Sequence, residues 1–281
     1  MTQSTPRPTV MLYAPVETFT LDKGPTALAL NLCEQHRMGL TAVMLAAAAA
    51  IAASPKGRTH DQLVEDSAML EARNKANAAA LARTTQAAGI DLDTITAIDH
   101  SRGFIPFVDD HARLHSLTII GTCDDGLLGE RMVAEGLLFE SGRPVLLVPR
   151  DHSAAFSARK IAVAWDNSRP AARALGDALA VLPGVAEVVF LTIGDEKEIA
   201  TSISTDEQLR AMTRRGLIAT HAQHNKGKRT IGAALQDAAL EAGSDLLVMG
   251  AYGHSRLRQF ILGGATLGVL GNLRLPVLMA H

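Results

Sequence analysis

The second half of the chain alternates short apolar runs with segments whose apolar residues recur at helical spacing. Runs of about four to eight apolar residues are typical of buried strands, and their alternation with helices is typical of a parallel sheet. The pattern predicts strands at 160–165, 186–193, 217–222, 245–249 and 276–280. The predicted helices lie between these strands, at 171–182, 205–215, 230–242 and about 264–273.

The first half repeats this plan. It predicts strands at 9–14, 40–45, 95–99, 117–121 and 144–148, with helices at 25–37 and 60–88. The segment LTIIG at 117–121 matches LLVMG at 246–250, and the closing strands at 142–148 and 273–280 also correspond. An internal duplication explains both matches. The polar stretch 150–159 lacks an apolar period, so we expect two domains, 1–150 and 151–281.

Strands that are apolar on both faces indicate a sheet covered by helices on both sides. The predicted fold is therefore α/β, with two tandem doubly wound open sheets. Each sheet has five mostly parallel strands in the order 3-2-1-4-5. The last strands, 144–148 and 276–280, are apolar edges that need covering, so we expect the two domains to pair through them. A homodimer of chains is a further association that this leaves open.

Charge and composition exclude several partners. The net charge is −2 with a pI near 6.5, and the basic residues are scattered, which argues against nucleic acid as a partner. The apolar run at 41–53 is shorter than the roughly 20 residues that cross a bilayer, so we expect no membrane partner. Cys33 and Cys123 lack metal-type spacing. Without a visible secretory signal, the sequence predicts a cytoplasmic protein.

The strand at 245–249 runs directly into a glycine-rich loop that carries the clearest candidate chemistry. Two residues separate Gly250 from Gly253, nine separate Gly253 from Gly263, and Gly264 follows at the predicted start of a helix. Such a start leaves backbone N–H groups free for an anion. In the order 3-2-1-4-5 this loop lies beside the turn at Asp166, at the edge where open parallel sheets bind ligands. An adenine nucleotide fits this arrangement.

The spacing of Gly250, Gly253 and Gly263 resembles that of the nucleotide-binding branch of the universal stress proteins, and the chain resembles a tandem member of that family. The family has Ser or Thr at the next position, where this chain has Gly264. The resemblance implies ATP or a related adenine nucleotide, with or without Mg²⁺, and no catalytic residues. The nucleotide-binding residues that it implies are Ala164, Asp166, Thr192, Met249, Gly250, Gly253, Gly263, Gly264, Ala265 and Thr266.

The equivalent loop of the first half, 121–126, lacks the long spacer and contains Asp124 and Asp125. Like charge opposes phosphate there, so we expect no nucleotide in the first domain. These carboxylates could form a metal site with Asp109, Asp110 and His111, but solvated loop carboxylates are the simpler interpretation.

Three enzyme classes lack their motifs. The run Gly253-His254-Ser255 is not followed by the acid that an esterase needs, and neither a Walker loop nor a dinucleotide fingerprint is present. No general base is placed near the glycine loop, so ATP hydrolysis would be slow and incidental. The sequence predicts a regulatory, nucleotide-binding stress-response protein. The alternative is a structural or protein-interaction module of the same fold that binds no nucleotide.

Overall fold

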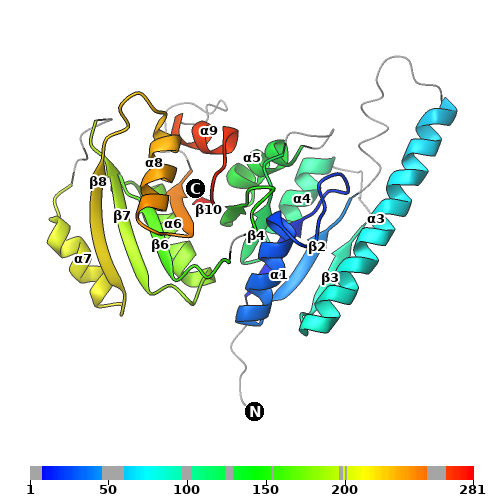
Figure 1. Cartoon of the computed structure of the whole chain (residues 1–281), viewed down its shortest axis with the longest axis horizontal. Coiled ribbons are helices and arrows are strands. Elements are labelled where there is room, and N and C mark those ends of the chain that lie inside the picture. The colour runs from blue at the N-terminus through cyan, green and yellow to red at the C-terminus, as the bar shows by residue number, and fades with distance from the viewer. Residues whose placement is uncertain are drawn as a thin grey trace, which may run out of the picture. The chain divides into compact units, whose positions relative to one another are not determined.

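The computed structural model of the chain describes residues 8–45, 60–96, 103–123, 129–153, 155–195, 199, 201–251 and 264–281. Contacts divide the chain into two units (Figure 1). Unit 1 comprises Met1–Arg143 and Arg150–Ser153, and unit 2 comprises Pro144–Pro149 and Ala154–His281.

Among its described residues, unit 1 contains four parallel strands in the order β3-β2-β1-β4. The strands are β1 (Thr9–Tyr13), β2 (Gly39–Val43), β3 (Leu92–Ile95) and β4 (Leu117–Ile120). The helices are α1 (Gly24–His36), α3 (His60–Ala88), α4 (Phe104–Ala112) and α5 (Glu130–Glu140).

Unit 2 contains five parallel strands in the order β8-β7-β6-β9-β10, and β5 adds to β10 in the antiparallel sense. The strands are β5 (Val145–Leu147), β6 (Lys160–Ala164), β7 (Glu187–Ile193), β8 (Ile218–His224), β9 (Leu246–Gly250) and β10 (Val277–Ala280). The helices are α6 (Arg169–Val181), α7 (Thr205–Thr213), α8 (Ile231–Glu241) and α9 (Gly264–Gly271). In chain order, the parallel strands of this unit follow the predicted 3-2-1-4-5.

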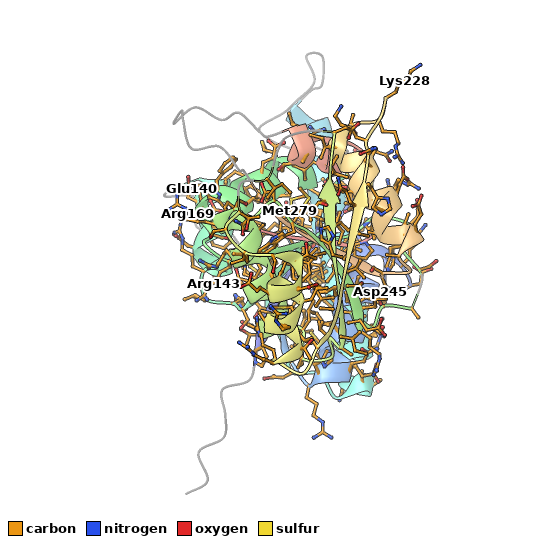
Figure 2. All side chains as sticks on the ribbon, turned by 90° about the vertical axis from the view of Figure 1, so that its left-hand side faces the viewer. Glu140, Arg143, Arg169, Lys228, Asp245 and Met279 are labelled. Carbon is orange, nitrogen blue, oxygen red and sulfur yellow. The ribbon has the colours of Figure 1, made fainter. Side chains whose placement is uncertain are left out.

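The predicted α/β class is confirmed, and the reason is visible in the burial of the central strands. All residues from Leu246 to Met249 are buried, so both faces of β9 are covered. Met279 in β10 is fully buried, whereas Figure 2 shows Lys228 extending away from the ribbon. Within the described residues, no helix combines the length and apolar character of a membrane-spanning segment.

Three elements of unit 1 differ from the prediction, and one of them is helix α5, which had no predicted counterpart. The third strand lies at Leu92–Ile95 rather than at 95–99, and its two middle residues are exposed, as expected of an edge strand with little apolar signal. Helix α4 had no predicted counterpart because Pro106 interrupts its pattern. Pro106 lies in the first turn, where its missing N–H would have had no intrahelical partner.

Candidate functional site

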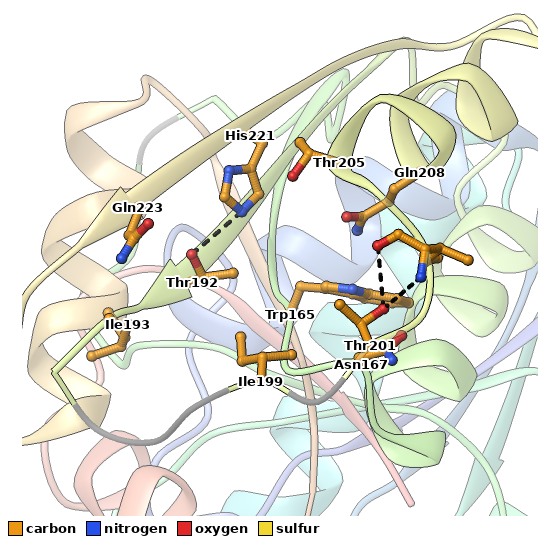
Figure 3. A pocket seen from close by; sticks show the side chains of 12 residues that line it. Trp165, Asn167, Thr192, Ile193, Ile199, Thr201, Thr205, Gln208, His221 and Gln223 are labelled. Atoms are coloured by element: carbon orange, nitrogen blue, oxygen red, sulfur yellow. Dashed lines mark hydrogen bonds between the residues drawn. The ribbon is translucent and has the colours of Figure 1, made fainter.

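A pocket of about 430 Å³ opens in unit 2 beside the carboxyl ends of β6 and β7 and the second half of β8 (Figure 3). Residues of the segment between β7 and α7, together with the first turn of α7, close its outer side. The lining residues are Trp165, Asn167, Thr192, Ile193, Gly194, Ile199, Thr201, Ile203, Thr205, Gln208, His221 and Gln223. Its size is within the range of roughly 300 to 1,000 Å³ that small-molecule sites occupy.

The turn between β6 and α6 forms one wall of this pocket, and local hydrogen bonds hold it. Asp166 Oδ1 accepts the Ser168 backbone N–H at 3.1 Å. Ser168 in turn caps α6, because its Oγ accepts the Ala171 N–H at 3.3 Å. Asn167 has a φ of 58°, a left-handed conformation that asparagine tolerates better than most residues. The Asp166 carboxylate therefore stabilises the turn before any ligand is considered.

Trp165 is fixed from two sides. Its backbone N–H donates to the carbonyl oxygen of Leu191 at 2.8 Å. Its indole meets the buried ring of Phe190 edge to face, with centroids 5.3 Å apart and planes at 75°. Such aromatic pairs contribute about 0.5 to 1.5 kcal/mol beyond the area that they bury. The pocket thus has a preorganised aromatic wall.

Thr192 and His221 join the neighbouring strands β7 and β8 across the pocket. Thr192 Oγ1 and His221 Nε2 lie 3.3 Å apart in a hydrogen bond, drawn as a dashed line in Figure 3. Burial lowers the pKa of His221, which favours the neutral imidazole. The pair therefore presents neutral polar groups rather than a charge.

Gln208 was not predicted from the sequence, yet it has the clearest unused polar atom in the pocket. Its Nε2 is buried and lacks a hydrogen-bond partner among the described residues. A capping box between Ser204 and Glu207 sets the start of α7, which places Thr205 and Gln208 one turn apart on the helix. A glutamine on a polar helix is usually solvated, so no signal in the sequence singled it out.

Gly250, the first glycine of the predicted loop, has a packing role. A Cβ atom there would lie 2.6 Å from the backbone carbon of Pro170 and 2.7 Å from the nitrogen of Ala171. Real Cβ atoms do not approach backbone this closely, so the glycine allows β9 to contact the start of α6.

The start of α9 shows the opposite environment. Gly264 is exposed, and a Cβ atom there would have no heavy atom within 4 Å. Thr266 is 2% exposed. The helix is held against α8 at Gly232, where a Cβ atom would lie 2.8 Å from the carbonyl oxygen of Ala265. Close packing of α8 on α9 therefore fixes the position of this helix start.

The predicted site residues lie at or just after the carboxyl ends of three strands and in the first turn of one helix. Thr192 lines the pocket, and Asp166 lies between the lining residues Trp165 and Asn167. The others lie where their elements end or begin: Ala164 at the end of β6, Met249 and Gly250 at the end of β9, and Gly264, Ala265 and Thr266 in the first turn of α9. Gly253 and Gly263 lie outside the described residues.

The carboxylates considered as a metal site in the first half have other environments. Asp109 is buried, and burial raises its pKa to about 6, while Asp110 forms an ion pair with Arg113. Across the described residues, no group of three or more His, Cys, Asp or Glu side chains could hold a metal ion. Asp124 and Asp125 lie outside this part of the chain.

Comparison with known proteins relates the second half of the chain to a family model and the whole chain to solved structures. Residues 157–281 match the model of the universal stress protein family. A universal stress protein from Archaeoglobus fulgidus has a similar structure, with a TM-score of 0.64 and 18% identity over 96% of this chain and 95% of that chain. A Pseudomonas aeruginosa protein with the same family name has a TM-score of 0.52 and 15% identity, covering 97% and 93% of the two chains.

At these identities the structural matches show a shared fold. Comparison with curated proteins finds no match. The second half of the chain, residues 157–281, thus matches the universal stress protein family, and the chain shares its fold along its length with solved members of that family.

Proposed function

We propose that unit 2 binds ATP or a related adenine nucleotide, and that the protein acts in stress response as a regulator rather than as a catalyst. The observation that carries this proposal is the pocket between Trp165, Thr192 and Gln208. It lies at the carboxyl ends of β6 and β7, and β9, which leads into the glycine-rich loop, ends at the same edge of the sheet. Nucleotides in open parallel sheets bind at this edge.

The lining of the pocket suits a heterocyclic base. The indole of Trp165 offers an aromatic surface, and the buried Gln208 Nε2 can donate to a ring nitrogen of adenine. The neutral pair of Thr192 and His221 can exchange hydrogen bonds without adding charge. Placing the base here would satisfy a buried donor, whose burial without a partner costs about 1 to 3 kcal/mol.

The phosphates would extend toward α9. Backbone N–H groups of Gly264, Ala265 and Thr266 begin this helix and are unpaired within its first turn. Asp166, beside the lining residues Trp165 and Asn167, would lie by the ribose or the adenine.

Among the lining residues that the structure describes, none is a carboxylate or a lysine that could act on a phosphate. His221, the titratable group of the lining, is neutral and hydrogen-bonded to Thr192. We therefore assign the site to binding, with hydrolysis at most slow and incidental. Cys33 and Cys123 are not joined in a disulfide, which is compatible with the cytoplasm, where we place the protein.

We further propose that the two sequence halves associate through their last strands. In support, β5, from the end of the first half, pairs with β10, with Leu146 opposite Leu278. The same surface would serve a dimer in a single-domain relative.

The single tryptophan of the sequence lies in the pocket and provides the test. Titration with ATP should change Trp165 fluorescence saturably, with one nucleotide per chain. Gln208→Ala should weaken binding, whereas Gln86→Ala on the exposed face of α3 should not. Absence of a saturable change at millimolar ATP would contradict nucleotide binding.

The competing function is an interaction module that binds no nucleotide. The packing role of Gly250 favours it, because this glycine is explained without a phosphate. Under this alternative, titration with ATP would give the same Trp165 fluorescence in Gln208→Ala as in the wild type.

A further inference from the structure

Glu130, the first residue of α5, is a buried carboxylate next to the end of β4 in unit 1. Glu130 is 4% exposed. Its Oε2 accepts the backbone N–H of Cys123 at 2.8 Å, and its Oε1 accepts the hydroxyl of Thr18 at 2.7 Å. A backbone N–H and a hydroxyl are the donors that proteins also use to hold phosphate oxygens.

The position of Glu130 corresponds to that of Gly264 in unit 2. In both units the central strand pairs in the same register with the strand that precedes the loop. Those two strands lead into Gly121 and Gly250, and the next helices begin at Glu130 and Gly264. In unit 1 a carboxylate therefore stands at the position that Gly264 has in unit 2.

Gly121 shows how closely this carboxylate approaches the loop. A Cβ atom on Gly121 would overlap the carboxyl group of Glu130. The glycine thus leaves the space that the carboxylate fills. Its counterpart Gly250 instead makes room for backbone of α6, so the two glycines serve different contacts.

The neighbouring space in unit 1 is filled by an aromatic ring. Tyr13 ends β1 at the position that Ala164 has in β6, and it is 2% exposed. Its ring meets Phe104 edge to face, with centroids 6.2 Å apart. Burial and the nearby charge of Glu130 raise the pKa of Tyr13, which places the carboxylate and the phenol in one buried environment.

We propose that unit 1 retains an oxyanion site and that its own Glu130 carboxylate occupies it. An anion from solution would meet a negative charge already bound to the same donors, so the unit takes no phosphate while Glu130 is in place. Removing this side chain frees the Cys123 N–H and the Thr18 hydroxyl for inorganic phosphate. The proposal is independent of nucleotide binding in unit 2.

Amide hydrogen exchange of Cys123, followed by NMR in the full chain, tests this directly. Glu130→Ala should accelerate exchange of this amide by roughly twofold to tenfold, the factor expected for one lost hydrogen bond. Inorganic phosphate should then slow the exchange again in the variant, and should leave the wild-type rate unchanged. Glu130→Ser offers a second variant if the alanine chain does not fold.

Glu135→Ala is the matched control, because this residue lies on the same helix in a partly exposed ion pair with Arg131. It should change neither the exchange of Cys123 nor its response to phosphate. If phosphate slows exchange in Glu130→Ala no more than in the wild type, Glu130 only links Cys123 to Thr18 and the proposal is wrong. Any phosphate bound by unit 2 is measured separately by Trp165 fluorescence.

Discussion

Gly250 and Pro170 bring a strand and a helix into backbone contact: a Cβ atom on Gly250 would lie 2.6 Å from the backbone carbon of Pro170. The contact joins the end of β9 to the first turn of α6, next to the Asp166 turn. The first glycine of the predicted loop is therefore required by the fold itself.

Gly250→Ala should destabilise unit 2 by about 1 to 3 kcal/mol, the usual cost of inserting a methyl group into a closely packed contact. Urea unfolding measures the change. Gly176→Ala in α6 is the control, and its effect on stability should have the opposite sign. No heavy atom lies within 4 Å of the position that its Cβ atom would take. This substitution should stabilise the helix by about 0.5 to 1 kcal/mol. Equal effects of the two substitutions would contradict the packing role.

Gly264→Ser should strengthen ATP binding by about twofold to tenfold, because it restores one hydroxyl donor at the start of α9. The open space around Gly264 allows the side chain without strain. Titration calorimetry provides the comparison. Gly271→Ser, at the end of the same helix, also has open space and should leave the affinity unchanged. If the two variants bind equally, the phosphates do not reach the start of α9.

Asp109 should make stability fall as the pH rises. It is 3% exposed, its Oδ1 lacks a hydrogen-bond partner within the described residues, and burial raises its pKa from 3.8 to about 6. Between these values the folded state retains a proton that the unfolded chain has lost. This carboxyl therefore lowers the free energy of unfolding progressively from about pH 4 to pH 6, and the loss persists at neutral pH.

Asp109→Asn should consequently raise stability at pH 7 by roughly 1 to 3 kcal/mol more than at pH 4. Chemical unfolding at both pH values tests the difference. Asp91→Asn, at an exposed position, should show no such dependence. A gain from Asp109→Asn that is the same at both pH values would rule out the buried carboxyl as its cause.

His221 should act in the opposite direction. Burial lowers its pKa below the usual 6.5, so the unfolded chain binds a proton before the folded one does. Its contribution to stability is present above pH 6.5 and is lost as the pH falls through the folded pKa. The thermal midpoint of unfolding should decrease less between pH 7.5 and pH 5 in His221→Gln than in the wild type. The control His36→Gln, in α1, should show the same decrease as the wild type.

The sequence predicted the fold more completely than the site. The order 3-2-1-4-5 was confirmed in the strands of unit 2, because continuous apolar runs such as 246–249 indicate doubly covered parallel strands. Edge strand β3 was misplaced and helix α4 was missed, since exposed residues and Pro106 weaken their patterns. Helix α5 was also missed. Gln208 and Glu130 escaped prediction because a single polar residue on a helix carries no local signal of burial.

By itself, the amino-acid sequence determined most of the succession of strands and helices and pointed to the resemblance of the second half to a known family, since these depend on local periodicity and short-range spacing. Only the tertiary structure decided that Gly250 faces Pro170, that Gln208 has a buried donor in the pocket, and that Glu130 accepts the hydroxyl of Thr18. Each of these depends on contacts between residues distant in the chain. Such contacts follow from how helices pack on the sheet, which the pattern of a single segment does not specify.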